Sequence, residues 1–184
     1  MPIDPTAIGA LTDAQRNQWT DRDTMLYALG VGAGTDDLPF TTDNSHDIAQ
    51  QVLPTFAVIC CPAFGAATKV GSFNWGMLLH GSQEIRLHAP LPASGELSVV
   101  SEVADIQDKG EGKNAVIVMR GRGTDPATGE LIAETLSTAV IRGEGCARTD
   151  SLGAHCFPSL RATTPRSSRR SARGSRRRCF RVRR

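Results

Sequence analysis

The sequence lacks the segments that mark exported and membrane-spanning proteins. Its N-terminus, MPIDPTAIGA, has no basic stretch followed by an apolar one and therefore does not match a secretory signal. The apolar stretch at residues 55–68 is interrupted by Pro62 and Gly65 and is shorter than the roughly 18 to 20 residues that a spanning helix needs. These absences predict a soluble protein, without a membrane span and with a cytoplasmic location.

The sequence lacks the cysteine spacing of a disulfide framework or a metal site. The chain has five cysteines, which is an odd number, and it contains no C-x-x-C pair. Cys60 and Cys61 are adjacent in an apolar run, and the other three lie at position 146 or beyond. We therefore predict free thiols in a reducing compartment. No metal site and no cofactor is predicted.

Lysine is absent after Gly145, and the charge of the chain changes sign at the same place. Residues 1–145 contain 9 Lys and Arg against 18 Asp and Glu, whereas residues 146–184 contain 12 Arg and one Asp. The formal net charge of +2 thus combines an acidic part with a basic one. At about 150 residues per domain, residues 1–145 are predicted to form one domain. Residues 146–184 have no helical or strand periodicity and are predicted to be a disordered tail.

The first third of the domain predicts one helix and one buried strand. Thr20 as N-cap, an acidic first turn, and Met25, Leu26 and Leu29 at helical spacing predict a helix whose apolar face lies in the core. Residues 53–61, LPTFAVICC, are rich in β-branched and aromatic side chains, which favours a buried strand. Residues 63–79 are expected to form only a loose helix or an irregular covering segment.

Four segments after this point alternate apolar and polar residues, as strands with one buried face do. They are residues 80–91, 96–106, 113–123 and 130–143, and Gly- and Pro-containing turn sequences separate them. The connections are too short for crossover helices, which excludes Rossmann and TIM-type folds. The predicted fold class is α+β, with a helix wrapped by an antiparallel sheet.

Three interpretations of the Arg-rich tail at residues 146–184 remain open. Its arginines suit a nucleic acid or an anionic lipid, because each can release a counterion from a phosphate backbone. Twelve arginines without a lysine are also expected if a GC-rich coding sequence were read out of frame. The third interpretation is a solvated linker.

Four local patterns carry a family resemblance. They are RDTMLYALGVGAG at 22–34, VLPTFAV at 52–58, LLHGSQEIRLHAPLP at 78–92 and DKGEGKNAVI at 108–117. In this order and spacing they resemble the N-terminal half of (R)-specific enoyl-CoA hydratases of the MaoC-like, double hot-dog family, which includes the hydratase part of peroxisomal multifunctional enzymes. The resemblance implies a single hot-dog-like domain over residues 1–145.

The resemblance also implies that catalysis belongs to the other half of such enzymes, in a motif of the type D-x-N-P-L-H. This sequence has no such motif, so no catalytic residue is predicted, and the chain is expected to be truncated or frameshifted after Gly145. Asp150 and His155 share the offset of the catalytic pair. We reject them, because the Asn, Pro and Leu are absent and only 29 residues follow.

The substrate-binding residues that the resemblance implies are His80, Gly81 and Lys109. A glycine at a strand start lets a ligand approach the backbone, and a lysine in a Gly-rich turn can meet a phosphate or the pantetheine oxygens. Residue type alone leaves another interpretation open, in which His80 is a strand-edge histidine and Lys109 is a solvated hairpin tip. Phe73 and Trp75 are expected to be walls of the acyl pocket.

The predicted function is therefore that of the acyl-CoA-binding half of a (3R)-specific 2-enoyl-CoA hydratase in fatty-acid or steroid side-chain β-oxidation, inactive alone. The alternative is a nucleic-acid-binding protein that acts through its tail. The expected partners are an acyl-CoA thioester and either a second copy of the chain or a catalytic hot-dog subunit, because half of a double hot dog exposes an apolar surface. The acyl-chain preference is left open.

Overall fold

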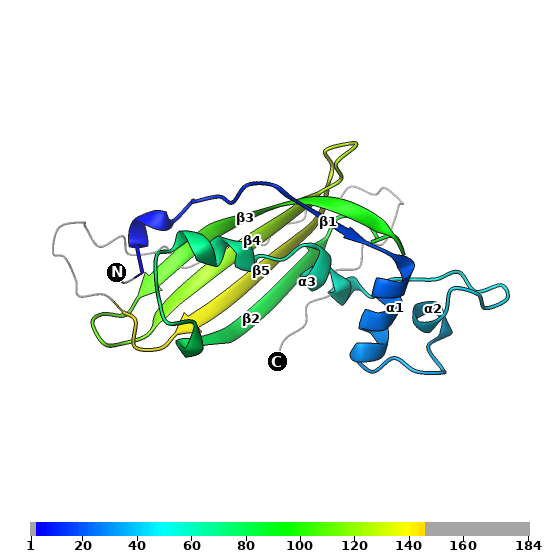
Figure 1. Cartoon of the computed structure of the whole chain (residues 1–184), viewed down its shortest axis with the longest axis horizontal. Coiled ribbons are helices and arrows are strands. Elements are labelled where there is room, and N and C mark those ends of the chain that lie inside the picture. The colour runs from blue at the N-terminus through cyan, green and yellow to red at the C-terminus, as the bar shows by residue number, and fades with distance from the viewer. Residues whose placement is uncertain (1–2, 146–184) are drawn as a thin grey trace, which may run out of the picture.

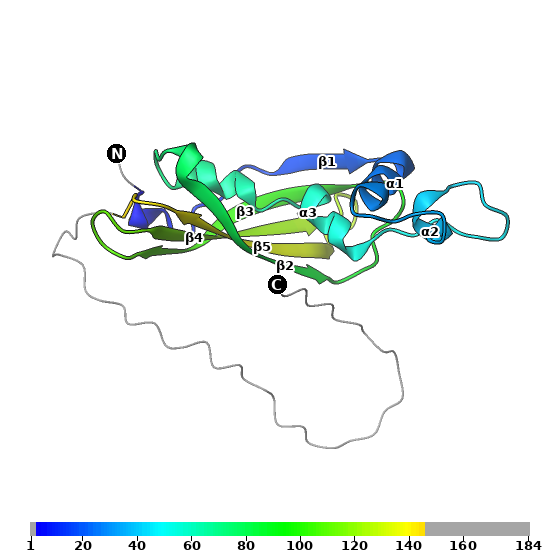
Figure 2. The same cartoon turned by 90° about the horizontal axis from the view of Figure 1, so that it is seen from below.

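A twisted antiparallel sheet, covered on one face by short helical segments, forms the body of the protein in the computed structural model, which describes residues 3–145 (Figures 1 and 2). The sheet has five strands in the order β1-β3-β4-β5-β2. Their bounds are β1 Gln15–Trp19, β2 Leu78–Leu87, β3 Gly95–Asp108, β4 Ala115–Thr124 and β5 Leu131–Ile141. The α-helices are α1 Asp21–Gly30, α2 Leu38–Thr41 and α3 Ala57–Cys60, and the 3₁₀ helices are η1 Pro5–Ala7, η2 Pro54–Phe56, η3 Phe64–Lys69 and η4 Trp75–Met77.

The four predicted strands are confirmed as β2 to β5. Along β5 the odd-numbered residues from Ala133 to Ile141 are buried and the even-numbered ones are half-buried, which is the period of a strand with one covered face. We call the covered side of the sheet its inner face. Strand β1 was not predicted, because its sequence QRNQW carries no apolar alternation; it is defined by its antiparallel pairing with β3.

The connection between β2 and β3 differs from the hairpin that its turn sequence suggests. β2 pairs with β5, in a register that places Leu78 opposite Ile141 and Leu87 opposite Ala133. β3 pairs instead with β1 and β4. The short link after Leu87 thus joins strands that lie on opposite sides of the central pair β4 and β5.

The predicted strand at residues 53–61 is wrong, since these residues form η2 and α3. Pro54 stands at the start of η2, where its fixed φ favours a helical turn and its missing N–H costs nothing. Phe56, Ala57 and Cys60 are buried and Ile59 is exposed, which is a one-sided helical pattern. The β-branched and aromatic content therefore reflects burial against the sheet and not a strand.

Helix α1 begins as predicted, with Thr20 as its N-cap. The Asp23 carboxylate accepts hydrogen bonds of 2.8 Å from the backbone N–H and the hydroxyl of Thr20. These bonds hold the pKa of Asp23 below its ordinary value. The helix stops at Gly30, and Gly32 takes the positive φ that favours glycine.

The predicted core role is wrong for Leu26 and Leu29, whereas Met25 is half-buried. Leu26 is 70% exposed and Leu29 is 52% exposed, while Thr24 and Ala28 are the buried residues of α1. Figure 1 shows the physical reason, because α1 lies beyond the end of the sheet and not on its inner face. The predicted α+β class is confirmed, but the helical segments on the sheet belong to residues 54–69, which we call the strap.

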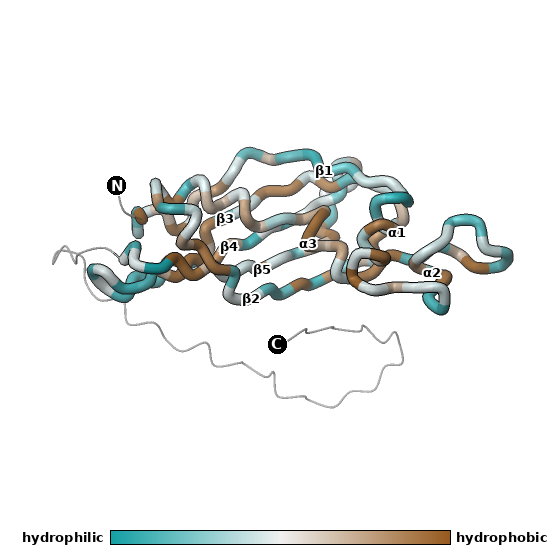
Figure 3. The backbone as a smooth tube through the Cα atoms, turned by 60° about the horizontal axis from the view of Figure 1, so that its bottom comes forward, coloured by the Kyte–Doolittle hydropathy of each residue, from teal (hydrophilic) through white to brown (hydrophobic). Residues whose placement is uncertain are grey.

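The core lies between the strap and the inner face of the sheet. Val70, Val103, Ile117 and Met119 are fully buried in one cluster, and a second cluster surrounds Phe56. Figure 3 shows hydrophobic residues along α3 and hydrophilic ones along the β3–β4 hairpin. The strap thus supplies the apolar cover that lets these strands bury one face.

Two carbonyl groups of the strap are tied to the sheet by side-chain hydroxyls. Thr135 donates to the carbonyl oxygen of Cys61 at 2.7 Å, and Ser101 donates to the carbonyl oxygen of Pro62 at 3.0 Å. Gly121 lies against both carbonyls, since a Cβ there would stand 3.0 Å from each oxygen and 2.8 Å from Oγ1 of Thr135. The absence of a side chain at Gly121 therefore lets the strap approach β4.

Candidate functional site

A cavity of about 400 Å³ lies between the strap and the edge pair β2 and β5. We call it the β2–β5 cavity. Its strap side is apolar and its sheet side is polar. The strap contributes Val58, Pro62, Ala63 and Phe64, and the strands contribute His80, Gln83, Thr135 and Ser137.

A β-bulge at Gly81 places His80 and Gln83 in the same cavity. His80 is opposite Ala139 and Ser82 is opposite Thr138, so Gly81 has no partner in the ladder with β5. Residues three apart on a regular strand point to opposite faces, and one extra residue cancels that difference. Both side chains therefore face the inner side.

The polar side chains of the cavity contact one another. Ser137 donates a 2.5 Å hydrogen bond to Oε1 of Gln83. Nε2 of His80 stands 3.5 Å from the same oxygen, at the limit of a hydrogen bond, and it would be the donor because an amide oxygen only accepts. The ring of Phe64 stacks on the imidazole with centroids 6.5 Å apart. His80 is thus oriented by a strap residue and by a strand residue.

Gly81 permits the bulge for a steric reason, which its residue type alone did not indicate. A Cβ at this position would stand 3.1 Å from the carbonyl oxygen of Thr138, so the glycine lets β2 lie close to β5. The atoms nearest to that position all belong to β5. A contact between Gly81 and a ligand stays a prediction.

Lys109 lies apart from the cavity. It is exposed in the β3–β4 hairpin, at the end of the sheet where β5 finishes and β2 starts. Lys109 is not among the residues that line the β2–β5 cavity. Of the three predicted site residues, His80 lines the cavity, Gly81 lies at the bulge next to it, and Lys109 lies on a neighbouring part of the surface.

Phe73 and Trp75 contact each other, with ring centroids 4.6 Å apart. Phe73 is buried in the core and Trp75 is 57% exposed. Neither lines the β2–β5 cavity, whose apolar side includes Val58 and Phe64 of the strap. Their expected role as walls of an acyl pocket stays a prediction.

Sequence reasoning missed Gln83, Thr135 and Ser137. A signal for the two hydroxyls was present, because Thr135 and Ser137 occupy inner positions of a strand whose other inner residues are Ala133, Ala139 and Ile141. Polar groups at buried positions are unusual unless they are hydrogen-bonded or functional. Gln83 had no such signal, since its orientation depends on the bulge.

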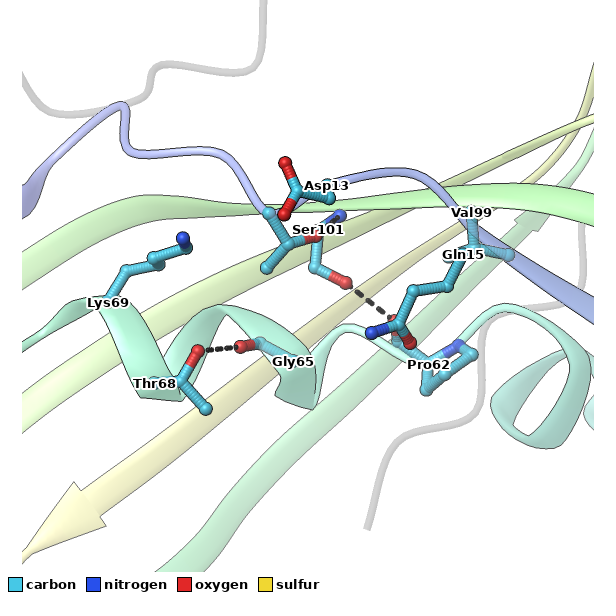
Figure 4. Close-up of a pocket in the computed structure, with 9 residues that line it drawn as sticks. Asp13, Gln15, Pro62, Gly65, Thr68, Lys69, Val99 and Ser101 are labelled. Atoms are coloured by element: carbon cyan, nitrogen blue, oxygen red, sulfur yellow. Dashed lines mark hydrogen bonds between the residues drawn. The ribbon is translucent and has the colours of Figure 1, made fainter.

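A second cavity of about 240 Å³ lies on the other side of the strap (Figure 4). Its lining is Thr12, Asp13, Gln15, Pro62, Gly65, Thr68, Lys69, Val99 and Ser101. Lys69 extends from η3 and Asp13 from the N-terminal segment, while Ser101 lies on β3 next to Asp13. Pro62 borders both cavities, and the hydrogen bonds of Cys61 and Pro62 to the sheet hold the strap down between them.

The two described thiols are unsuited to nucleophilic chemistry. Cys60 and Cys61 are free and buried. Burial raises the pKa of Cys60 to about 12 and that of Cys61 to about 11, so both are protonated at neutral pH. Between residues 3 and 145 there is no group of three side chains placed to hold a metal ion, and no helix there is long and apolar enough to cross a membrane.

The cavity is limited in the chemistry that it can perform. It contains one imidazole, one amide and two hydroxyls, but no carboxylate lines it. Glu84, the nearest acid along β2, is opposite Leu136, on the face away from the strap, and pairs with Arg86 at 2.9 Å. The site can hold and orient a ligand, but its own side chains do not include an acid and a base in contact.

Comparison with known proteins decides the family. Residues 17–143 match the family described as MFE-2 hydratase 2 N-terminal domain. The chain belongs to this family. The match covers the end of β1, all of β2 to β5 and both sides of the β2–β5 cavity.

Relatives of this hydratase 2 N-terminal domain carry hydratase and dehydratase names. The chain is 73% identical over 145 residues to 3-hydroxyacyl-thioester dehydratase Y of Mycobacterium tuberculosis, covering 79% of this chain and 50% of the relative. It is 36% identical over 152 residues to enoyl-CoA hydratase ChsH3 of the same organism, covering 79% and 52%. The chain thus spans about half the length of these relatives.

Solved structures confirm the hot-dog-like fold of this hydratase 2 N-terminal domain. A MaoC-like dehydratase from Phytophthora capsici matches with a TM-score of 0.63 at 23% identity, over 79% of this chain and 51% of that one. Peroxisomal multifunctional enzyme type 2 from Drosophila melanogaster matches with a TM-score of 0.55 at 28% identity, over 79% and 24%. The predicted resemblance and the predicted fold class are therefore confirmed.

Proposed function

We propose that this chain is the acyl-CoA-binding half of a (3R)-specific 2-enoyl-CoA hydratase, and that it is inactive alone. The family and the relatives support a hydratase or dehydratase. The observation that carries the proposal is the β2–β5 cavity, which has an apolar wall for an acyl group and polar groups but no carboxylate.

The absence of a carboxylate from the cavity lining matters because of what hydration requires. Water adds across C2 and C3 of the enoyl thioester only when a base removes a proton from it, an acid protonates the carbon next to the carbonyl, and donors stabilise the developing enolate oxygen. His80 alone does not provide these three functions. In this proposal His80 contacts the thioester at the cavity mouth, and catalysis belongs to a second hot-dog half.

Lys109 is proposed to contact the nucleotide end of CoA. Its ammonium group is a compact donor that suits phosphate oxygens, and the β3–β4 hairpin holds it at the end of the sheet nearest the start of β2. Contacts to the phosphates are separate from the chemistry at the acyl group. Binding should therefore survive where catalysis does not.

A hot-dog partner is proposed as well. The start of β2 and the turn before it expose Trp75, Met77 and Leu79, which are 57%, 38% and 51% accessible. Exposed apolar side chains close together in the sequence can form a surface that favours association. The partner is a second copy of the chain or a separate catalytic subunit, and a monomer in sedimentation at micromolar concentration would contradict this part of the proposal.

Two assays test the function. Titration of the chain with an acyl-CoA should show binding that weakens in a His80→Ala variant, because the imidazole forms part of the cavity mouth. Hydration of a trans-2-enoyl-CoA should be undetectable, since positioned acids and bases each contribute about 100- to 10,000-fold. Turnover that disappears in a His155→Ala variant would show that the rejected Asp150 and His155 pair is catalytic.

The nucleic-acid alternative depends on residues 146–184, which lie outside the described part of the chain. It predicts binding that falls steeply with salt and is lost when these residues are deleted. The hydratase proposal predicts that the same deletion leaves acyl-CoA binding intact. One deletion variant therefore separates the two functions.

A further inference from the structure

The polar side chains of the β2–β5 cavity form a line along the inner face. His80 is opposite Ala139, Gln83 is opposite Ser137, and two residues further along β5 lies Thr135. At about 3.4 Å per residue, Ser137 lies about 7 Å beyond the level of His80 and Thr135 about 14 Å beyond it. The line follows the direction in which an acyl chain would extend from a thioester at His80.

Burial distinguishes the two ends of this line. Thr135 is 1% exposed and Ser137 is 3% exposed, whereas His80 is exposed. His80 therefore marks the mouth, and the two hydroxyls lie on the floor. The opposite wall is apolar, since Val58, Pro62, Ala63 and Phe64 supply it.

The floor retains unused hydrogen-bonding capacity. Thr135 donates to Cys61 and Ser137 donates to Gln83, so both hydroxyl oxygens keep lone pairs for a further donor. The amide nitrogen of Gln83 makes only a long 3.4 Å bond to the carbonyl oxygen of Glu84 within residues 3–145. One of its two hydrogens is free to donate. Thr135 and Ser137 thus offer two acceptors on the floor, and Gln83 beside them offers one donor.

Within residues 3–145 every buried polar side-chain atom already has a hydrogen-bond partner, so a plain hydrocarbon chain would break no bond here, but it would leave the remaining lone pairs and the amide hydrogen of Gln83 unused. A site that offers hydrogen-bonding groups favours ligands that carry the matching group over ligands that lack it. A hydroxyl can donate and accept at once, which matches the floor better than a methylene does. The apolar strap would contact the rest of the chain.

We propose that the β2–β5 cavity selects acyl groups that carry a hydroxyl in the body of the chain, beyond the thioester by roughly the distance from His80 to Ser137. Gln83, Thr135 and Ser137 determine this preference. The inference rests on the proposed acyl-CoA binding and adds to it the class of acyl group.

The test compares three CoA thioesters of equal chain length in calorimetric titrations with the full chain. One is saturated, one has a hydroxyl at carbon 3, and one has a hydroxyl near the middle of the chain. The mid-chain hydroxyl should bind about tenfold more tightly than the saturated thioester, as one good buried hydrogen bond would give. Equal affinity for all three thioesters would overturn the inference and leave the proposed function standing, and no binding of any would overturn the proposed function itself.

Variants assign the preference to the floor. Ser137→Ala and Gln83→Met should each reduce the preference for the mid-chain hydroxyl while leaving the affinity for the saturated thioester unchanged or higher. Thr138→Val, on the outer face of the same strand, is the matched control and should change neither value. Circular dichroism checks that each variant is folded. A preference that persists in both cavity variants would show that the floor does not determine it.

Discussion

The hydroxyl of Thr135 donates a 2.7 Å hydrogen bond to the carbonyl oxygen of Cys61. This bond joins β5 to the strap at the place where α3 has just ended and no helical N–H is available for that carbonyl. It therefore fixes one side of the β2–β5 cavity and satisfies a buried acceptor at the same time.

Replacing Thr135 with Val should destabilise the protein by about 1 to 3 kcal/mol, the cost of leaving a buried acceptor without a partner. Denaturant unfolding measures the change. Thr138→Val is the control, because Thr138 is only half-buried on the other face, and it should change the unfolding free energy much less. Equal effects from both variants would mean that the bond to Cys61 contributes nothing specific.

Gly121→Ala should also destabilise the fold, by about 1 to 3 kcal/mol, because the new methyl group would lie 2.8 Å from Oγ1 of Thr135 and 3.0 Å from two backbone oxygens of the strap, which cannot move aside as the end of a flexible side chain can. Thermal unfolding is the measurement. Gly34→Ala is the control, because a Cβ at Gly34 has no atom within 4 Å and its backbone does not have a positive φ. If Gly121→Ala were as stable as the control, the strap would not lie as close to β4 as described.

The stability of the protein should fall as the pH rises from about 9 to about 12. Burial raises the pKa of Cys60 from 9.0 to about 12 and that of Cys61 to about 11, so the folded state keeps protons that the unfolded state releases. The unfolding free energy therefore decreases above the unfolded pKa. A Cys60→Ala and Cys61→Ala double variant should show a shallower decrease over this range, and an unchanged slope would contradict the assignment.

Lys109→Ala should weaken acyl-CoA binding several-fold and reduce its salt dependence, because one cation near the phosphates would be lost. Lys113→Ala removes a charge from the same hairpin and is the matched control, since Lys113 is not assigned to the site. Titrations at two salt concentrations measure both. Identical titrations for the parent chain and the Lys109 variant would remove Lys109 from the site.

Trypsin should remove residues 146–184 early and leave a resistant core that ends near Gly145. The composition of this segment predicts the result, because it has many arginines and little apolar surface to bury. Mass spectrometry of the digest identifies the boundary. Resistance to cleavage would contradict the predicted disordered tail.

The sequence predicted what depends on local periodicity and missed what depends on packing. The alternation of apolar and polar residues was sufficient to predict β2 to β5. Thr20 with Asp23 was sufficient to predict the start of α1. Residues 53–61 were misassigned because side chains that favour strands are also the ones that a short buried helix needs against a sheet. Leu26 and Leu29 follow a helical period but lie beyond the sheet, and no local signal gives that position.

The residues of the candidate site likewise divide into those that the sequence identified and those whose position depends on packing. His80 was identified from family resemblance, and the structure places it in a cavity. Gln83 depends on a bulge that shifts the strand by one residue, and Phe64 depends on how the strap lies over the sheet. Both are consequences of contacts between segments that are distant in the sequence.

The strand order also bears on how quickly the cavity can form. Strands β3, β4 and β5 are joined by hairpins and can pair while the rest of the chain is still open. β2 must instead find β5 across a loop that separates Leu78 from Ile141, and the closure of a long loop has an entropic cost that slows folding. We therefore expect β2, which carries His80, to join the sheet late. A species in which β3, β4 and β5 have already paired would then precede any species able to bind a ligand.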